Sequence, residues 1–174
     1  NTSRAEIVNQ SANVALINLT AESRDSKTFK EGEQHHDYGS LLSPVLHGCR
    51  SIIIEEPYAL DTYQWQRVQD FLVEVMRYPT IGQVTLRTNG SDKDKLPQTV
   101  KQLTSKLLFD GIELCVKRVT GLHWRFAFFI HDECAWKVHI DRGLFDLLQR
   151  KTAIEFAKVR TGLMETDKFI ISSE

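Results

Sequence analysis

The spacing of apolar residues predicts an alternation of strands and helices through the first two thirds of the chain. Period-two runs and continuous apolar runs indicate strands, and stripes at helical spacing indicate helices. The expected elements are a strand at 12–19, a polar loop to 34, a short helix capped by Ser40, a buried strand at 50–55, a helix from Asp61 or Thr62 to Tyr78, a strand at 82–88, a helix from Pro97 to Leu108 and a half-exposed strand at 112–119. Strands joined through helices favour right-handed crossovers and parallel pairing.

The last third is rich in strand patterns. Residues 121–144 read as one hairpin with a turn at Asp132-Glu133. A short helical piece at 144–148 and strands at 153–159 and 169–172 follow. The sequence therefore predicts an α/β fold with a mixed, mainly parallel sheet flanked by helices, which finishes in antiparallel strands.

Composition narrows the class of protein. A chain of 174 residues with 41% hydrophobic and 26% charged residues predicts one domain, in which residues 1–34 add a strand and a polar loop to a main body at 35–174. The net charge of -1 excludes a strongly basic nucleic-acid or membrane-binding protein, so only a local patch can serve such a role. Three cysteines without CxxC spacing predict neither a disulfide framework nor a zinc site, and favour the cytoplasm. Because the chain starts at Asn1, we expect an upstream domain in a longer protein.

Arg125 begins the hairpin on the face that is expected to meet the core. Strand parity places it with Ala127, Phe129, Trp136 and Val138. A charge there needs a carboxylate or a bound anion. The candidate carboxylates are Glu56, Asp141 and Glu165. A structural ion pair, an anion site and a catalytic site all remain open from the residues alone.

The opposite face of the hairpin carries Phe126 and Phe128 with Lys137 and His139. Aromatic rings beside cations can stack a base or meet phosphates, but the same residues also suit ordinary packing. His131-x-x-Cys134 offers too few ligands for zinc, so we expect no metal and no cofactor. A second basic group suited to acidic lipid or nucleic acid consists of Arg150, Lys151, Lys158 and Arg160.

Three separated motifs resemble one known family. They are Tyr38-Gly39-Ser40-Leu41-Leu42 leading to Ile52-Ile53-Ile54-Glu55-Glu56-Pro57-Tyr58, then His123-x-Arg125 with Ala135-Trp136 and Asp141-Arg142-Gly143, and finally Met164-Glu165-Thr166. In this order the motifs are similar to the phospholipase D-like domain that follows the microtubule-interacting-and-trafficking (MIT) domain in a eukaryotic cytokinesis protein, which has relatives at the C-terminus of bacterial Lon-like proteins. The resemblance implies a phospholipase D-like fold.

The catalytic signature of the phospholipase D superfamily is incomplete in this sequence. That superfamily uses HxKxxxxD, in which His accepts the phosphoryl group, Lys holds phosphate and Asp orients the His. Counted from His123, the Lys position is Arg125 and the Asp position is Ile130. The signature therefore keeps a cation at Arg125 but has no carboxylate at residue 130. No second HxK or HxR occurs in the chain. Activity would therefore require a dimer that joins two His123 side chains.

The resemblance thus implies a non-catalytic interaction module. We expect it to anchor or recruit a larger protein through an acidic ligand, either phospholipid or nucleic acid, or through a partner protein bound by the upstream domain. The alternative is a phosphodiesterase or nuclease with a dimeric His123 site. The expected ligand-binding residues are His123, Arg125, Lys137, Arg142 and Glu165. We also expect a homodimer and a cytoplasmic protein that can lie peripherally at a membrane.

Overall fold

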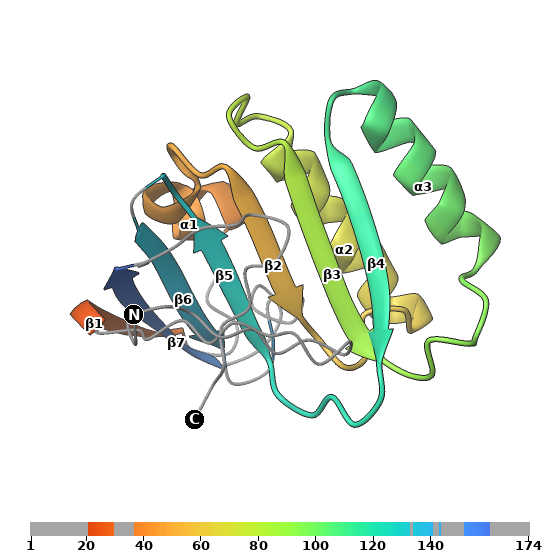
Figure 1. Cartoon of the computed structure of the whole chain (residues 1–174). Coiled ribbons are helices and arrows are strands. Elements are labelled where there is room, and N and C mark those ends of the chain that lie inside the picture. Colours follow the sequence, from red (N-terminus) through yellow and green to blue (C-terminus); the bar gives the residue numbers. More distant parts are fainter. Residues whose placement is uncertain (1–20, 30–36, 133, 141–142, 144–151, 161–174) are drawn as a thin grey trace, which may run out of the picture.

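A computed structural model of the chain describes residues 21–29, 37–132, 134–140, 143 and 152–160 (Figure 1). Side chains are described for all of these except residues 21–29, 40, 140 and 152–160. The elements are β1 (Ala21–Phe29), α1 (Tyr38–Leu46), β2 (Ser51–Glu55), α2 (Thr62–Val75), β3 (Gln83–Asn89), α3 (Gln98–Phe109), β4 (Glu113–Val119), β5 (Phe126–Ile130), β6 (Cys134–Ile140) and β7 (Thr152–Arg160).

The strands form one mixed sheet with the order β1-β7-β6-β5-β2-β3-β4. The pairs β2–β3 and β3–β4 are parallel and are linked through α2 and α3, as predicted. The remaining pairs, β2–β5, β5–β6, β6–β7 and β7–β1, are antiparallel. The mixed α/β class and its antiparallel finish are confirmed. The expectation of a mainly parallel sheet is wrong, because only the two helical crossovers produce parallel neighbours and the strands after β4 pair antiparallel.

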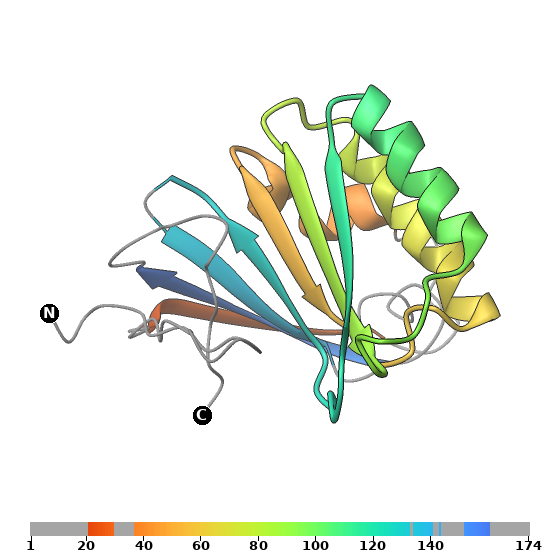
Figure 2. The same cartoon turned by 45° about the vertical axis from the view of Figure 1, so that its right-hand side comes forward.

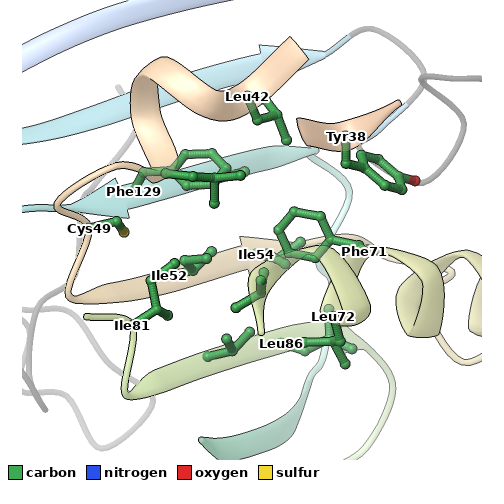
Figure 3. Packing of buried hydrophobic residues seen from close by; sticks show 14 of the residues in the cluster. Tyr38, Leu42, Cys49, Ile52, Ile54, Phe71, Leu72, Ile81, Leu86 and Phe129 are labelled. Carbon is green, nitrogen blue, oxygen red and sulfur yellow. The ribbon is translucent and has the colours of Figure 1, made fainter. Parts of the chain in front are cut away.

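The described helices cover one face of the sheet (Figures 1 and 2). Between them and the strands lies the main core (Figure 3). In α2 the predicted stripe is confirmed at Val68, Phe71, Leu72 and Val75, which are all buried, whereas Met76 at its end is 43% exposed. The largest fully buried core side chains include Leu42, Leu46, Ile52, Ile54, Phe71, Leu86, Leu107 and Phe129. Burial of this apolar surface is the main force that holds the helices on the sheet.

The predicted hairpin is present as β5 and β6. Its register pairs Phe129 with Trp136 and Ala127 with Val138, and these four residues belong to the core side. Phe126 and Phe128 pair with His139 and Lys137 on the other face. Both faces therefore follow the strand parity read from the sequence.

Two local expectations are wrong. Residues 21–29 were expected in the polar loop, but they form β1, which pairs with β7. This strand lies at the end of the sheet, where pairing needs little apolar alternation. Helix α1 begins at Tyr38, so Ser40 is not its cap; the Asp37 carbonyl accepts the hydrogen bond from the Leu41 N–H.

The expected strand at 153–159 is confirmed as β7. The expected strands at 12–19 and 169–172 and the helical piece at 144–148 lie outside the described residues. Among the helices that the structure describes, none is both long and apolar enough to span a bilayer.

Candidate functional site

The candidate residues meet where β2 ends and β5 begins. The antiparallel register pairs Glu55, the last residue of β2, with Phe126, the first residue of β5. The segment that precedes β5 therefore lies beside the residues that follow β2. This brings His123 and Arg125 to the same edge as Glu56 and unites the first two sequence motifs.

Arg125 is held by Glu56. Its Nε donates a hydrogen bond to Glu56 Oε2 at 3.0 Å, and its guanidinium lies 5.5 Å from the centre of the Tyr58 ring. The Glu56 side chain is only 1% exposed, whereas 31% of the Arg125 side chain remains exposed. A carboxylate buried this deeply requires a cationic partner. Glu56 is thus the partner of Arg125 among the three candidates; Asp141 and Glu165 lie outside the described residues.

Gly143 packs directly against this ion pair. A Cβ added at Gly143 would lie 2.6 Å from Glu56 Oε1 and 3.0 Å from Arg125 Cδ. Its φ of +83° also falls in the region that favours glycine. The close approach of the backbone to the ion pair therefore explains why the Asp-Arg-Gly motif has a glycine at this position. Arg142, which precedes it, is outside the described residues.

His123 is exposed in the connection between β4 and β5. It stands two residues before Arg125, so the structure brings these two predicted site residues to one edge. The other described histidines are engaged elsewhere. His131 Nε2 lies 2.8 Å from the Val45 carbonyl oxygen, and the rings of His47 and His139 pack against Tyr78 and Phe126.

Lys137 is separated from Arg125 by the sheet. Its register with Phe128 places it on the face opposite the helices, and its Nζ lies 4.3 Å from the centre of the Phe126 ring. That distance is typical of a cation–π contact. The structure therefore divides the predicted site residues between two faces. Glu165, like Arg142, lies outside the described residues.

The sequence interpretation missed a second buried carboxylate, Glu55. It is 6% exposed, and its Oε2 lies 3.7 Å from Nη1 of Arg87, which neighbours it on β3. Burial raises the pKa of Glu55, while a hydrogen bond from Trp124 and the charges of Arg87 and Lys137 oppose that rise. Strand parity was the signal that could have found this residue, because adjacent acids at a strand end point to opposite faces and each needs its own partner.

One carboxylate of the phospholipase D signature is missing from its position in this chain. The position at which the signature has its aspartate is Ile130, a fully buried residue of β5. Burial raises the pKa of the Cys49 thiol to about 12, so this cysteine is no alternative nucleophile. No cluster of three potential metal ligands occurs among the described residues. The site offers a guanidinium positioned by Glu56, and an exposed imidazole two residues earlier in the chain.

Comparison with solved structures returns proteins of low similarity. A structure of yeast tyrosyl-DNA phosphodiesterase aligns at 9% identity over 82% of this chain and 34% of that one, with a TM-score of 0.47. A mutant of the same enzyme aligns at 9% identity over 78% and 30%, with a TM-score of 0.46. The archaeal chromatin protein TrmBL2, whose structure is described as showing a novel mode of DNA binding, aligns at 11% identity over 79% and 47%, with a TM-score of 0.36. The chain spans only about a third of the length of the phosphodiesterase structures.

No curated protein sequence matches the chain. The model of one family does match it, over residues 35–171, and that family is described as the phospholipase D-like domain at the C-terminus of MIT. The match covers all three motifs that carry the resemblance, including the Glu56–Arg125 pair at the edge of the sheet. The chain therefore belongs to the family of phospholipase D-like domains found at the C-terminus of MIT.

Proposed function

We propose that this domain is a non-catalytic module that binds a phosphate-bearing ligand at the edge formed by His123 and Arg125, and so anchors or recruits a larger protein. The proposal rests on the guanidinium of Arg125, which is held on one side and partly exposed to solvent. Glu56 engages its Nε, yet 31% of the side chain stays exposed. A guanidinium has five N–H donors, so the remaining ones can bind the oxygen atoms of an anion.

Two further features support binding over catalysis. The orienting carboxylate of the signature is replaced by the buried Ile130. The buried Glu56 fixes Arg125 and neutralises part of its charge, which suits a rigid recognition group better than a strong phosphate clamp. Arg142, next to Gly143 in the sequence, belongs to the proposed site on sequence grounds. Lys137 is proposed as a secondary contact on the opposite face.

The test is a direct binding measurement with three probes. We expect the chain to bind vesicles that contain an acidic phospholipid, or single-stranded DNA, and to ignore neutral phosphatidylcholine vesicles. The His123→Ala variant should weaken binding about threefold and the Glu56→Gln/Arg125→Gln double variant about tenfold. The double variant changes both members of the ion pair together. The control is Lys101→Gln, which removes one exposed cation on α3.

The two acidic probes also separate the two ligand classes. Binding of acidic vesicles alone favours a role at a membrane surface, and binding of DNA alone favours nucleic acid. Binding to neither probe, or binding that the double variant and the Lys101→Gln control weaken equally, overturns the proposed site.

The alternative is a phosphodiesterase in which two copies join their His123 side chains. The exposure of His123 beside Arg125 favours it, because a covalent nucleophile must reach the substrate. Hydrolysis of bis(p-nitrophenyl) phosphate that is lost in His123→Ala would establish this activity. We expect no turnover by the unmodified chain or by His123→Ala, because residue 130 does not supply the orienting carboxylate of the signature.

A homodimer is the second part of the proposed function. It concerns how the module assembles, and ligand binding by a single copy does not depend on it. The following inference rests on this dimer.

A further inference from the structure

The open edge of the sheet at β4 is a candidate for pairing with another chain. Among the described strands, β4 pairs with β3 alone (Figure 1). The Glu113 N–H donates to the Gly82 carbonyl at 2.9 Å, and the Val119 carbonyl accepts from the Gly90 N–H at 3.4 Å. Residues 113 and 119 thus turn their backbone groups toward β3. By strand alternation, Leu114, Val116 and Arg118 direct theirs away from the sheet, where another strand can meet them.

The side chains of β4 are complementary to a second, antiparallel copy of themselves. In a register centred on Cys115, Glu113 of each copy stands directly opposite Lys117 of the other. Both residues are exposed and lie on the same face of the strand. Opposite charges on directly facing residues favour a cross-strand pair, and the two-fold axis makes this pair twice.

The other face of β4 is complementary in the same register. Leu114 of each copy stands opposite Val116 of the other, and both residues pack on the helix side. Their outward backbone groups are those that make the hydrogen-bonded pairs of an antiparallel ladder. The register with Lys117 opposite itself would instead set two like charges face to face. The sequence of β4 therefore selects one of the neighbouring registers.

Features at the two ends of β4 extend this complementarity beyond the strand. Only residues 110–112 separate β4 from the end of α3, where Leu108 is 62% and Phe109 is 92% exposed. At the other end of β4, Val116 and Val119 help to line a hollow of about 520 Å³, together with Asp92, Asp94, Leu96, Lys117, Arg118 and Thr120. Antiparallel pairing brings the apolar end of each α3 beside the hollow of the partner copy. Helix α3 runs along this edge strand (Figures 1 and 2).

We infer that two copies of this chain pair through β4, antiparallel and centred on Cys115, with the apolar end of each α3 beside the other copy's hollow. A stable interface buries at least about 1,000 Å², which a short strand pair alone does not supply. The contribution of α3 is therefore required. The connection to β5 leaves from the carboxyl end of β4, so the two His123 residues lie toward opposite ends of this interface. Such a dimer does not assemble a joint catalytic site.

The first test measures the molar mass of the chain by analytical ultracentrifugation across a concentration series. We expect a reversible dimer. Glu113→Lys and Lys117→Glu should each raise its dissociation constant roughly 10- to 30-fold, because two attractive contacts become repulsive. The Glu113→Lys/Lys117→Glu double variant should restore the constant to within about threefold of the original. Both residues are exposed in the single chain, so these variants are not expected to disturb folding.

The second test uses the native cysteines. Cys115 faces its own symmetry mate in a non-hydrogen-bonded pair, where side chains come closest. Under copper–phenanthroline, which takes up the two electrons that two thiols release as they form a disulfide, we expect a covalent dimer. Cys115→Ser should abolish this product while it retains Cys49 and Cys134. Phe109→Ser should weaken the reversible dimer, since it removes an exposed apolar side chain at the edge.

The outcomes separate this inference from the proposed function. A monomer at every concentration overturns both the dimer and this interface, while ligand binding is judged by the vesicle and DNA probes alone. A dimer that ignores the charge reversals and forms no Cys115 crosslink overturns the β4 interface and leaves the proposed homodimer in place. Restoration by the double charge reversal supports the pairing, and a partner strand from another protein would not produce it.

Discussion

Two arginine–carboxylate pairs close the two ends of the ladder between β2 and β5, with the same distance in very different surroundings. Arg125 precedes β5 and meets Glu56, which follows β2; Arg50 precedes β2 and meets Asp132, which follows β5. In each pair Nε lies 3.0 Å from a carboxylate oxygen. At the first end the carboxylate side chain is 1% exposed, and at the second it is 71% exposed.

This comparison indicates that burial, more than the Nε–O distance, decides how much such a pair contributes to the free energy of unfolding. An exposed pair gains little, because water solvates both charges well when the pair is open. A buried carboxylate has lost most of its hydration, so removal of a cationic partner costs more free energy there than at the surface. The buried end is also the one where the family motifs converge. The carboxylate at the edge that carries His123 is therefore buried and held in one place, whereas the carboxylate at the opposite edge is exposed to solvent.

The largest expected effect comes from breaking the buried pair on one side. Arg125→Met should lower the free energy of unfolding by about 2–4 kcal/mol, because the buried Glu56 loses the hydrogen bond and the positive charge that Arg125 supplies. Urea unfolding at neutral pH measures this change. The Glu56→Gln/Arg125→Met double variant is the matched control and should lose less than Arg125→Met alone. Equal or greater loss in the double variant would mean that Arg125 acts through packing and not through charge.

The second effect tests the glycine that packs on the same pair. Gly143→Ala should cost about 2–3 kcal/mol, since it combines a left-handed backbone with a Cβ too close to Glu56 and Arg125. Gly121 has nearly the same φ, +81°, but no atom lies within 4 Å of a Cβ built there. Gly121→Ala should therefore cost only about 1 kcal/mol. Similar losses in thermal or urea unfolding of the two variants would deny any special role to the contact with the pair.

The sequence predicted that Arg125 needs a carboxylate partner, but it did not predict which acid fills that role. Parity along the hairpin placed Arg125 on the core side, and burial logic required a carboxylate. Three acids stayed eligible, because only the antiparallel register of β5 on β2 makes Glu56 the neighbour. Glu55 went unnoticed for a related reason: the apolar patterns predicted that β2 and β3 are neighbours, but not the register that sets Arg87 beside Glu55.

The fold class followed from the same kind of information. The helix-linked strands β2, β3 and β4 carry strong apolar patterns, and these predicted their parallel pairing. Residues 22–28 all carry polar side chains, so no local pattern indicates that this segment pairs with β7. Edge strands owe their structure to the neighbour that they join, which periodicity does not reveal.

The third effect is the pH dependence of folding stability that arises from Glu55, the second buried carboxylate. Burial raises the pKa of Glu55 from its ordinary value of 4.5, so the folded chain holds this proton more tightly than the unfolded chain. Its favourable contribution is complete below that ordinary value and is lost as pH rises through the folded-state pKa. The stability of the wild type minus that of Glu55→Gln should therefore fall as pH rises across this window. Chemical unfolding at a series of pH values measures the difference, and a flat or rising difference would contradict the assignment.

The smallest expected effect is at the exposed end of the ladder. Asp132→Asn removes the charge that faces Arg50 and should leave the urea midpoint unchanged within measurement error, although the Nε–O distance equals that of the buried pair. Added salt should not alter this result, because little interaction is present to be screened. A loss in Asp132→Asn comparable with that of Arg125→Met would show that closing the ladder matters at both ends. Burial would then not be what separates the two pairs.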